Sequence, residues 1–276
     1  MKRVFITGAS SGLGAALAAH YAAEGAQLGL LARREQTLSD LRSTLPHPER
    51  HRLYVVDVCD HAALAAAAAD FLQQAGGIDI VIANAGVSYG TLTERDGDLP
   101  VFEKIIATNL TATVATFTPF IAAMKNQAAA GQRNLRLVGI GSVAGIRGLP
   151  GAEAYSASKA AVISYCESLR IEMRRHRIRV VTIAPGYIDT PMTQLNTYAM
   201  PFLLPASDFA ARAAKRIAAG CSYAIIPWQM RGVSWLLKLL PNAVYDFAFA
   251  RAPYKASITE QQEIQKQQAA NHAAMD

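Results

Sequence analysis

Short runs of β-branched and aliphatic residues alternate along this chain with longer segments rich in Ala, Leu, Glu and Gln. This rhythm is typical of βαβ units, whose strands pair in parallel and whose right-handed crossovers place helices on both faces of the sheet. Several runs are apolar throughout, as strands buried between two helix layers must be. The sequence therefore predicts an α/β protein with a doubly wound, mostly parallel seven-stranded sheet. The predicted strands are residues 3–7, 27–32, 52–56, 79–83, 135–141, 178–184 and 223–227.

Length and composition limit the domain organisation. The chain has 276 residues, of which 51% are hydrophobic and 17% charged, so it can bury one sizeable core but is long for one compact domain. We expect a single domain over residues 1–228 and a C-terminal helical extension with a polar tail over 229–276.

The formal net charge of +6 favours anionic ligands or surfaces. Three cysteines without metal or redox spacing, and a start unlike a signal peptide, predict a cytoplasmic protein with free thiols.

A glycine-rich turn follows the first predicted strand. Gly8, Gly12 and Gly14 lead into an apolar-periodic helix over residues 13–23. Glycines let the backbone approach a pyrophosphate closely, and the N-terminus of a helix presents unpaired N–H groups to an anion. Because ligands of doubly wound sheets bind at the carboxyl ends of the strands, this turn is a predicted dinucleotide site.

Motifs after the later strands add to this prediction. The spacing Thr7-Gly8-x-x-x-Gly12-x-Gly14 resembles the cofactor loop of the short-chain dehydrogenase/reductase family. Further motifs follow in the family's order, and the resemblance covers roughly residues 2–192. In ANAG at 83–86, Ala83 replaces the family's first Asn. The other motifs are Asp57-Val58, Asn109 in ATNLTA, Ser142 in GIGSVAG, Tyr155 and Lys159 in YSASK, and PGYIDT at 185–190. The resemblance implies a Rossmann-type domain that oxidises or reduces its substrate.

Tyr155 and Lys159 are the centre of the predicted chemistry. They are four residues apart on a predicted helix and therefore share a face, so we expect the ammonium to favour the phenolate and lower the pKa of the tyrosine. A hydroxyl at Ser142, after a buried strand, can polarise a carbonyl. The family resemblance implies that Tyr155 transfers the proton, that Lys159 also serves the ribose hydroxyls, and that Asn109 takes part in a water relay.

The end of the second strand predicts which cofactor is used. In this fold it faces the adenosine ribose, where an arginine pairs with a 2′-phosphate, so Arg33 favours NADP(H) over NAD(H). We expect less from Arg34, because alternation along the strand turns its side chain away, unless the loop after the strand twists it back toward the adenine. No metal site is predicted. The cofactor-binding residues implied by the resemblance are Gly8, Ser10, Ser11, Gly12, Leu13, Gly14, Arg33, Arg34, Asp57, Val58, Asn84, Ala85, Gly86, Tyr155, Lys159, Pro185, Gly186, Ile188 and Thr190.

The substrate is less well defined by the sequence. A variable lid predicted at about residues 190–215 mixes Pro, Met and large apolar residues, which favours an apolar carbonyl or alcohol substrate. We therefore expect an NADP(H)-dependent oxidoreductase that interconverts a carbonyl and a secondary alcohol. The alternative is an NAD(P)-binding regulatory or scaffold protein without turnover. No nucleic-acid partner is expected, because the basic residues are explained by the cofactor and by helix ends.

The segment 229–252 allows three interpretations. It is apolar but interrupted by Lys238 and Pro241, and too short to span a bilayer. It can pack on the domain or at a dimer interface, form a wall of a hydrophobic substrate pocket, or lie on a membrane surface as a peripheral anchor. We favour a homodimer and leave the peripheral membrane contact open. The polar, Gln-rich end of the chain predicts a frayed helix or a disordered tail.

Overall fold

The computed structural model describes residues 1–196 and 198–273, and within them the side chains other than those of residues 265 and 268–273. The molecule is built on a seven-stranded sheet in the order β3-β2-β1-β4-β5-β6-β9, in which every neighbouring pair is parallel. The strands are β1 (Arg3–Thr7), β2 (Gln27–Ala32), β3 (Arg52–Val55), β4 (Ile80–Ala83), β5 (Arg136–Ile140), β6 (Arg179–Pro185) and β9 (Tyr223–Ile226). The predicted fold class is confirmed, and each predicted strand is found with its ends shifted by at most one residue.

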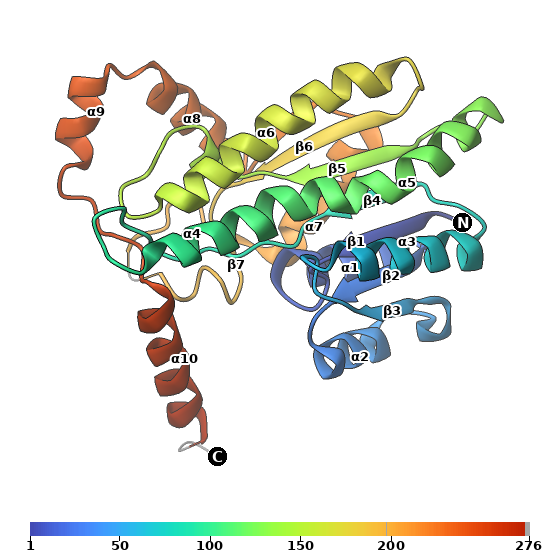
Figure 1. Ribbon diagram of the computed structural model, residues 1–276, viewed down its shortest axis with the longest axis horizontal. Helices are drawn as coiled ribbons and strands as arrows, with labels where there is room; N and C mark the ends of the chain where they lie inside the picture. Colours follow the sequence, from blue (N-terminus) through green and yellow to red (C-terminus); the bar gives the residue numbers. More distant parts are fainter. Residues whose placement is uncertain (197, 274–276) are drawn as a thin grey trace.

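Helices cover both faces of the sheet. One face carries α1 (Gly12–Ala23), α2 (Glu35–Thr44) and α7 (Ala206–Ala219), and the other carries α3 (His61–Ala75), α4 (Asp98–Ile106), α5 (Ala112–Ala129) and α6 (Glu153–Arg174). Figure 1 shows α4, α5 and α6 running across the near face. Successive strand residues point to opposite cores. Ile6 packs with the first set of helices, whereas the ring of Phe5 lies 4.9 Å from that of Phe120 and 5.6 Å from that of Phe71, between centroids.

The strand order reverses beside β1. The chain leaves β1 through α1 on one face of the sheet and leaves β4 through α4 and α5 on the other. Such a reversal opens a crevice at the carboxyl ends of the strands, which is the usual ligand site of doubly wound sheets. The loops after β1, β4 and β5 therefore meet at this crevice.

Part of the predicted lid belongs to the core. β8 (Leu204–Pro205) pairs with β7 (Ile188–Asp189), and residues 206–215 form most of α7. Phe209 and its apolar neighbours on α7 are buried in the core together with residues of α1. The lid prediction over 190–215 is therefore wrong for 206–215, because apolar residues at helical spacing there pack into the core.

One helical stretch among the described residues, Asp98–Ala129, is long and apolar enough to cross a membrane by length and composition alone. It comprises α4, a π-helical turn (Ala107–Thr111) and α5. Phe117, Phe120 and Met124 of this stretch are fully buried in the core beside the sheet, so packing within the domain accounts for its apolar character.

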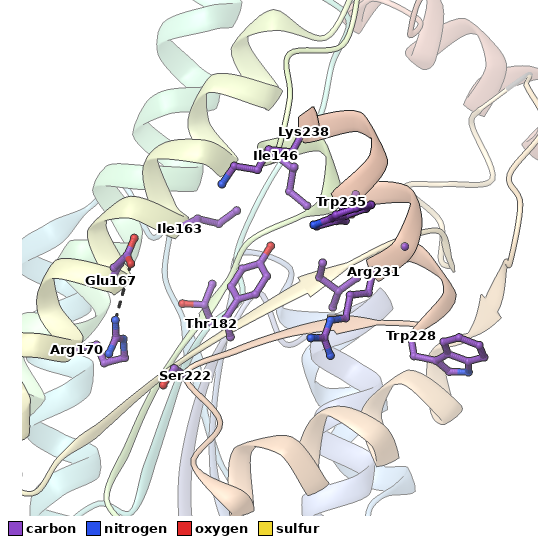
Figure 2. Close-up of a pocket in the computed structure, with 15 residues that line it drawn as sticks. Ile146, Ile163, Glu167, Arg170, Thr182, Ser222, Trp228, Arg231, Trp235 and Lys238 are labelled. Carbon is purple, nitrogen blue, oxygen red and sulfur yellow. Dashed lines mark ion pairs between the residues drawn. The ribbon is translucent and has the colours of Figure 1, made fainter. Parts of the chain in front are cut away.

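The C-terminal segment forms α8 (Gln229–Leu239), α9 (Asn242–Phe249) and α10 (Ile258–Ala273), and α10 projects away from the sheet in Figure 1. A groove of about 770 Å³ lies between α8, α6 and the edge strand β9 (Figure 2). Trp235 and Arg231 of α8 line one side, and Glu167 of α6 lines the other. The large apolar side chains exposed on and next to α8 and α9 are Trp228, Trp235, Leu236, Leu239, Val244 and Phe247.

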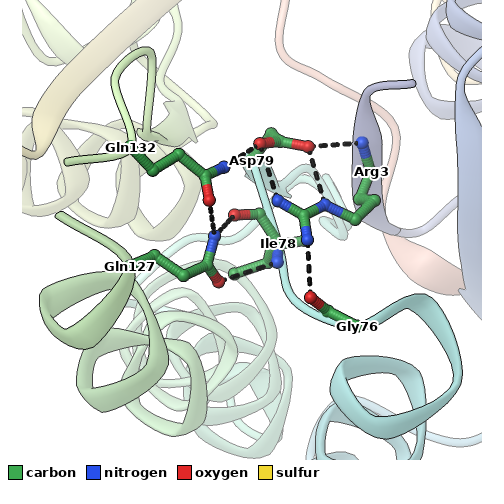
Figure 3. A network of polar contacts seen from close by, with 6 residues as sticks. All are labelled: Arg3, Gly76, Ile78, Asp79, Gln127 and Gln132. Carbon is green, nitrogen blue, oxygen red and sulfur yellow. Dashed lines mark hydrogen bonds and ion pairs between the residues drawn. The ribbon is translucent and has the colours of Figure 1, made fainter. Parts of the chain in front are cut away.

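A polar network at the amino ends of the strands joins β1, β4 and the end of α5 (Figure 3). Arg3 donates to both carboxylate oxygens of Asp79, from Nε at 2.9 Å and from Nη2 at 3.0 Å, and its backbone N–H donates to the same carboxylate at 2.8 Å. Gln132 also donates to Asp79 and accepts a hydrogen bond from Gln127 at 2.8 Å. The Arg3 and Asp79 side chains are only 17% and 16% exposed, so the pair is largely shielded from solvent.

We expect Asp79→Ala to lower the free energy of unfolding by about 2 kcal/mol, because it leaves the Arg3 guanidinium desolvated without its carboxylate. Urea unfolding measures the loss. The matched control is Glu24→Ala, which removes the exposed Lys2–Glu24 pair at 2.6 Å and is expected to cost less than about 1 kcal/mol. Equal losses for the two variants would contradict the structural role of the network.

Candidate active site

A cavity of about 360 Å³ lies at the carboxyl ends of the strands. All the predicted catalytic and cofactor-binding residues line it except Gly14 and Asn109. The loops after β1, β2, β3, β4, β5 and β6 and the start of α6 each contribute to its wall. Residues distant in sequence are therefore brought together by the common edge of the parallel sheet.

The glycine loop is held in place by the loop after β4. Gly8 (φ +66°) and Gly12 (φ +54°) adopt the left-handed conformation that favours glycine. A Cβ on Gly8 would lie 2.7 Å from the Cα of Ala85, so the two loops are in backbone contact. Asn84 donates from Nδ2 to the carbonyl oxygens of Thr7 at 3.0 Å and Gly8 at 3.1 Å. Asn84 thus lines the cavity, but its amide group serves to shape the loop.

Gly14 stands directly behind this loop. A Cβ there would lie 2.1 Å from the carbonyl oxygen of Gly8 and 2.6 Å from Asn84 Nδ2. The absence of a side chain lets α1 begin against the loop backbone. The first N–H groups of α1 have no partner within the helix, and its first turn carries no acidic residue. A glycine cradle at such a helix end fits the pyrophosphate of a dinucleotide.

Both arginines after β2 reach the cavity. Arg33 Nη1 lies 3.6 Å from Asp57 Oδ2, and Arg34 Nη2 donates to Ser10 Oγ in the glycine loop at 3.2 Å. Arg34 does not turn away but is brought back by the loop, the alternative left open above, because β2 ends at Ala32 and the chain bends at Arg33, so strand alternation no longer applies. Arg34 thereby brings a cation to a loop whose own residues 9–11 are uncharged.

Ser142, Tyr155 and Lys159 meet deeper in the cavity. Ser142 follows β5, and the other two lie on the first turns of α6. Ser142 and Tyr155 line the cavity together, and Ser142 Oγ accepts from the N–H of Ala144 at 3.1 Å. Lys159 is 5% exposed, and its Nζ donates to the carbonyl oxygen of Ile140 at 2.9 Å and lies 5.8 Å from the centroid of the Tyr155 ring.

The pKa of Tyr155 departs from the prediction. Burial raises the pKa of Tyr155, and the hydrogen bond from Ser142 offsets the rise in part. Burial also lowers the pKa of Lys159 to about 8. The expectation that Lys159 lowers the tyrosine pKa is wrong in this structure, because its ammonium is directed at the Ile140 carbonyl. At neutral pH the phenol of Tyr155 therefore keeps its proton.

Asn109 lies in the π-helical turn and is fully buried. Its Oδ1 accepts from the Val87 N–H at 2.8 Å, and its Nδ2 donates to the Val87 carbonyl and to Ser158 Oγ, both at 3.0 Å. These bonds use both amide hydrogens and one acceptor position of Oδ1, and the water relay stays a prediction. Asn109 is a positioning residue that joins the helix α4–α5 to the loop after β4 and to α6.

The segment after β6 lies against the glycine loop. Gly186 donates its N–H to the Ile226 carbonyl at 2.8 Å, and a Cβ on it would lie 2.7 Å from Met230 Cγ. Buried Thr190 approaches Gly12 so closely that a Cβ on Gly12 would lie 3.4 Å from the threonine side chain. This part of the cavity wall is thus held between β9, the start of α8 and the glycine loop.

The sequence prediction missed several lining residues. Most are direct neighbours of predicted ones, so the motifs themselves could have located them. The missed residues are Ala32, Val56, Val87, Thr108, Ile140, Gly141, Pro191, Met192 and Thr193. Lys255 does not line this cavity but a neighbouring one of about 380 Å³ beside the start of α10, and its Nζ lies 5.6 Å from the centroid of the Tyr155 ring. No sequence signal connects Lys255 with α6, because it lies between α9 and α10 outside any recognised motif.

The larger groove beside α8 is a separate feature. None of the predicted site residues lines it, so its size does not make it the better candidate for catalysis. Over the described ranges, no group of three or more His, Cys, Asp or Glu side chains is placed to hold a metal ion.

The chain is similar to known proteins over most of its length. A sequence profile of the family described as short chain dehydrogenase matches residues 2–200. An uncharacterized oxidoreductase of Myxococcus xanthus is 35% identical over 254 residues, which are 91% of this chain and 97% of that protein. The dehydrogenase/reductase SDR family member 7B of Bos taurus is 36% identical over 198 residues, 69% of this chain and 59% of that protein.

Among solved structures, 3-ketoacyl-(acyl-carrier-protein) reductase from Brucella melitensis, complexed with NADH, superposes with a TM-score of 0.75. It is 25% identical, and the match covers 81% of this chain and 95% of that one. The chain therefore belongs to the short-chain dehydrogenase/reductase family of oxidoreductases.

Proposed function

We propose that the protein is an NADP(H)-dependent oxidoreductase that interconverts a carbonyl and a secondary alcohol. The observation that carries the proposal is that Ser142, Tyr155 and Lys159 line the same cavity as the glycine loop. A binding protein without turnover needs the loop but has no use for a hydroxyl, a phenol and an ammonium gathered at its far end.

A bound nicotinamide dinucleotide supplies or accepts the hydride in such a reaction. Tyr155 gives its proton to the carbonyl oxygen, or takes one from the alcohol, and its raised pKa keeps that proton in place at neutral pH for reduction. Ser142 donates a hydrogen bond to the same oxygen and stabilises the charge that develops there. The Lys159 ammonium, held by the Ile140 carbonyl, would bind the ribose hydroxyls of the cofactor.

The two arginines support NADP(H) as the cofactor. A guanidinium presents a planar fork of donors that matches a phosphate, and both Arg33 and Arg34 line the cavity beside the glycine loop. The crystal of the Brucella melitensis relative holds NADH, so the preference has to be measured for this chain.

Arg33→Asp is expected to weaken NADPH binding roughly ten- to a hundredfold, because it removes a charge-assisted hydrogen bond and opposes the 2′-phosphate with a carboxylate. Arg34→Ala is expected to weaken it by about tenfold. Arg52→Ala is the control, because Arg52 bonds Gln74 outside the cavity and should leave binding unchanged. The measurement is the dissociation constant of NADPH and NADH at fixed salt. A wild-type protein that prefers NADH would overturn the assignment.

The substrate class we propose is a ketone or alcohol that is apolar next to the aromatic side chains of the site. Tyr187 and Tyr198 stack edge to face with ring centroids 6.3 Å apart. Burial, with the Tyr187 and Tyr155 phenols nearby, raises the pKa of Tyr198 to about 12, which is consistent with an aromatic wall near Tyr155. The test is NADPH oxidation with ketones of increasing chain length. Binding of the dinucleotide with no turnover of any ketone would favour the alternative, a regulatory or scaffold role.

For the quaternary structure we propose a homodimer. The edge strand β9 and the exposed apolar side chains of α8 and α9 offer a surface that a second copy can bury. Sedimentation velocity is expected to give the mass of two chains. A monomer that instead sediments with anionic vesicles would favour the peripheral membrane contact through residues 229–252.

A further inference from the structure

The segment that leads into α10 is attached to the rim of the candidate active site. The Gly90 N–H donates to the Ala256 carbonyl at 2.8 Å. Gln261, only 6% exposed, donates from Nε2 to the carbonyl of Ser88 at 3.1 Å and to that of Ala256 at 2.9 Å. Residues 254–261, which we call the strap, are thus bonded to the loop after β4, whose first residues line the cavity.

Two glycines make room for the strap. A Cβ on Gly90 would lie 2.0 Å from the carbonyl oxygen of Lys255. Gly151 (φ +68°) stands just before α6, and a Cβ there would lie 2.7 Å from the Cβ of Tyr254. The strap therefore packs closely on the elements that carry the site, through the backbone of Lys255 at Gly90 and the side chain of Tyr254 at Gly151.

The strap places Lys255 beside Tyr155. Its Nζ lies 5.6 Å from the centroid of the Tyr155 ring, so two lysines, Lys255 and Lys159, approach one phenol. The two differ in their partners. Lys159 donates to the Ile140 carbonyl, whereas no ion pair or hydrogen bond holds the Lys255 ammonium within the described part of the chain.

The ammonium of Lys255 is partly desolvated at this position. Burial lowers the pKa of Lys255 to about 8, so the lysine remains mostly charged at neutral pH but with only part of its normal hydration. A cation held in this way is costly unless an anion joins it. The strap residue Glu260 does not supply this anion, because its carboxylate accepts a hydrogen bond from the N–H of Ser257 at 2.7 Å.

We propose that Lys255 binds an anionic group of the substrate, and that the substrate is a keto acid, or the matching hydroxy acid, whose carboxylate lies next to the reacting carbon or one carbon away. This inference rests on the proposed function, since it takes Tyr155 as the residue that faces the reacting oxygen. The short span between the Lys255 ammonium and the Tyr155 ring sets the position of the carboxylate. The remainder of the substrate stays apolar, against Tyr187 and Tyr198.

The experiment compares phenylglyoxylate, a keto acid, with its neutral methyl ester as NADPH-dependent substrates of the full chain. Wild type is expected to prefer the acid. Lys255→Met is expected to lower the acid-to-ester ratio of kcat/KM roughly ten- to a hundredfold, the effect of losing one charge-assisted hydrogen bond. Lys255→Arg keeps the charge and should retain most of the preference.

The control is Lys104→Met. Lys104 Nζ lies 5.5 Å from the centroid of the Tyr89 ring, a similar cation–π arrangement on α4 away from the cavity, so the acid-to-ester ratio should not change. Equal losses of acid and ester in Lys255→Met would overturn the inference, because they would mean that the lysine acts on Tyr155 or on the fold. A wild type that turns over the ester but does not prefer the acid would overturn it as well.

Calorimetric binding of phenylglyoxylate separates this inference from the proposed function. If no ketone is turned over but the acid binds and Lys255→Met abolishes the binding, the anion site stands and the proposed function fails. If ketones are turned over and the acid binds equally to wild type and Lys255→Met, the proposed function stands and the anion site fails.

Discussion

Tyr155→Phe is expected to lower kcat for ketone reduction by about 100- to 10,000-fold, the usual contribution of a positioned general acid. The substitution removes only the phenolic oxygen, and the ring keeps its place beside Lys159 and Lys255. NADPH affinity should therefore change little. Steady-state turnover with a ketone and titration of NADPH fluorescence measure the two effects separately.

Two further variants test whether the loss of turnover is specific to the phenolic oxygen of Tyr155. Lys159→Ala should reduce both turnover and cofactor affinity, because it removes the group assigned to the ribose and leaves the Ile140 carbonyl without its donor. Tyr21→Phe is the matched control. Tyr21 is buried in the core on α1, and its hydroxyl has no hydrogen-bond partner among the described residues, so turnover should be unaffected. Ketone reduction that survives in Tyr155→Phe would remove the tyrosine from the mechanism.

The second large effect is expected from Gly14→Ala. A Cβ 2.1 Å from the Gly8 carbonyl oxygen cannot be accommodated by a side-chain rotation, because the obstacle is backbone. Either α1 or the glycine loop must move, at a cost on the order of 3 kcal/mol for overpacking. The same movement disturbs Asn84, which holds the loop, so NADPH affinity should fall by at least about tenfold.

Gly232→Ala is the control for this change. Gly232 lies in α8 with nothing within 4 Å of the position of its Cβ, so the same substitution should stabilise the helix by about 0.5–1 kcal/mol and leave NADPH binding unchanged. Urea unfolding and NADPH titration are carried out on both variants. Loss of stability without loss of affinity in Gly14→Ala would show that α1, and not the loop, gives way.

The strands and the lining of the cavity could be predicted because their signals are local. Runs such as residues 27–32 are apolar throughout because both faces of the strand are covered, and Gly8 marks the turn that must follow β1. In a parallel sheet the carboxyl ends of strands share one edge, so motifs placed after strands necessarily meet. Ser142 and Tyr155 were therefore predicted to lie in one cavity without any knowledge of distances.

Orientation within the site was not predictable in the same way. The turn of Arg34 toward Ser10 depends on where β2 ends and how the chain bends after it. The Lys159 ammonium could reach the phenol or the Ile140 carbonyl, and spacing along α6 does not distinguish them. Asn109 is polar and was expected to face a relay, yet the π-helical turn directs its amide to Val87. Each outcome depends on competition among hydrogen-bond partners that the fold assembles.

By itself, the sequence determined the sheet and its helices, because hydrophobic periodicity and turn residues encode which faces are buried. The resemblance of its ordered motifs indicated the family. The tertiary structure alone decided that residues 206–215 pack into the core as part of α7 and that the strap crosses to the active site. Lys255 is exactly 100 residues beyond Tyr155, in a stretch without periodicity. The approach of Lys255 to Tyr155 depends on the close contacts of Gly90 and Gly151 with the strap. Contacts between irregular segments leave no repeating pattern in a sequence.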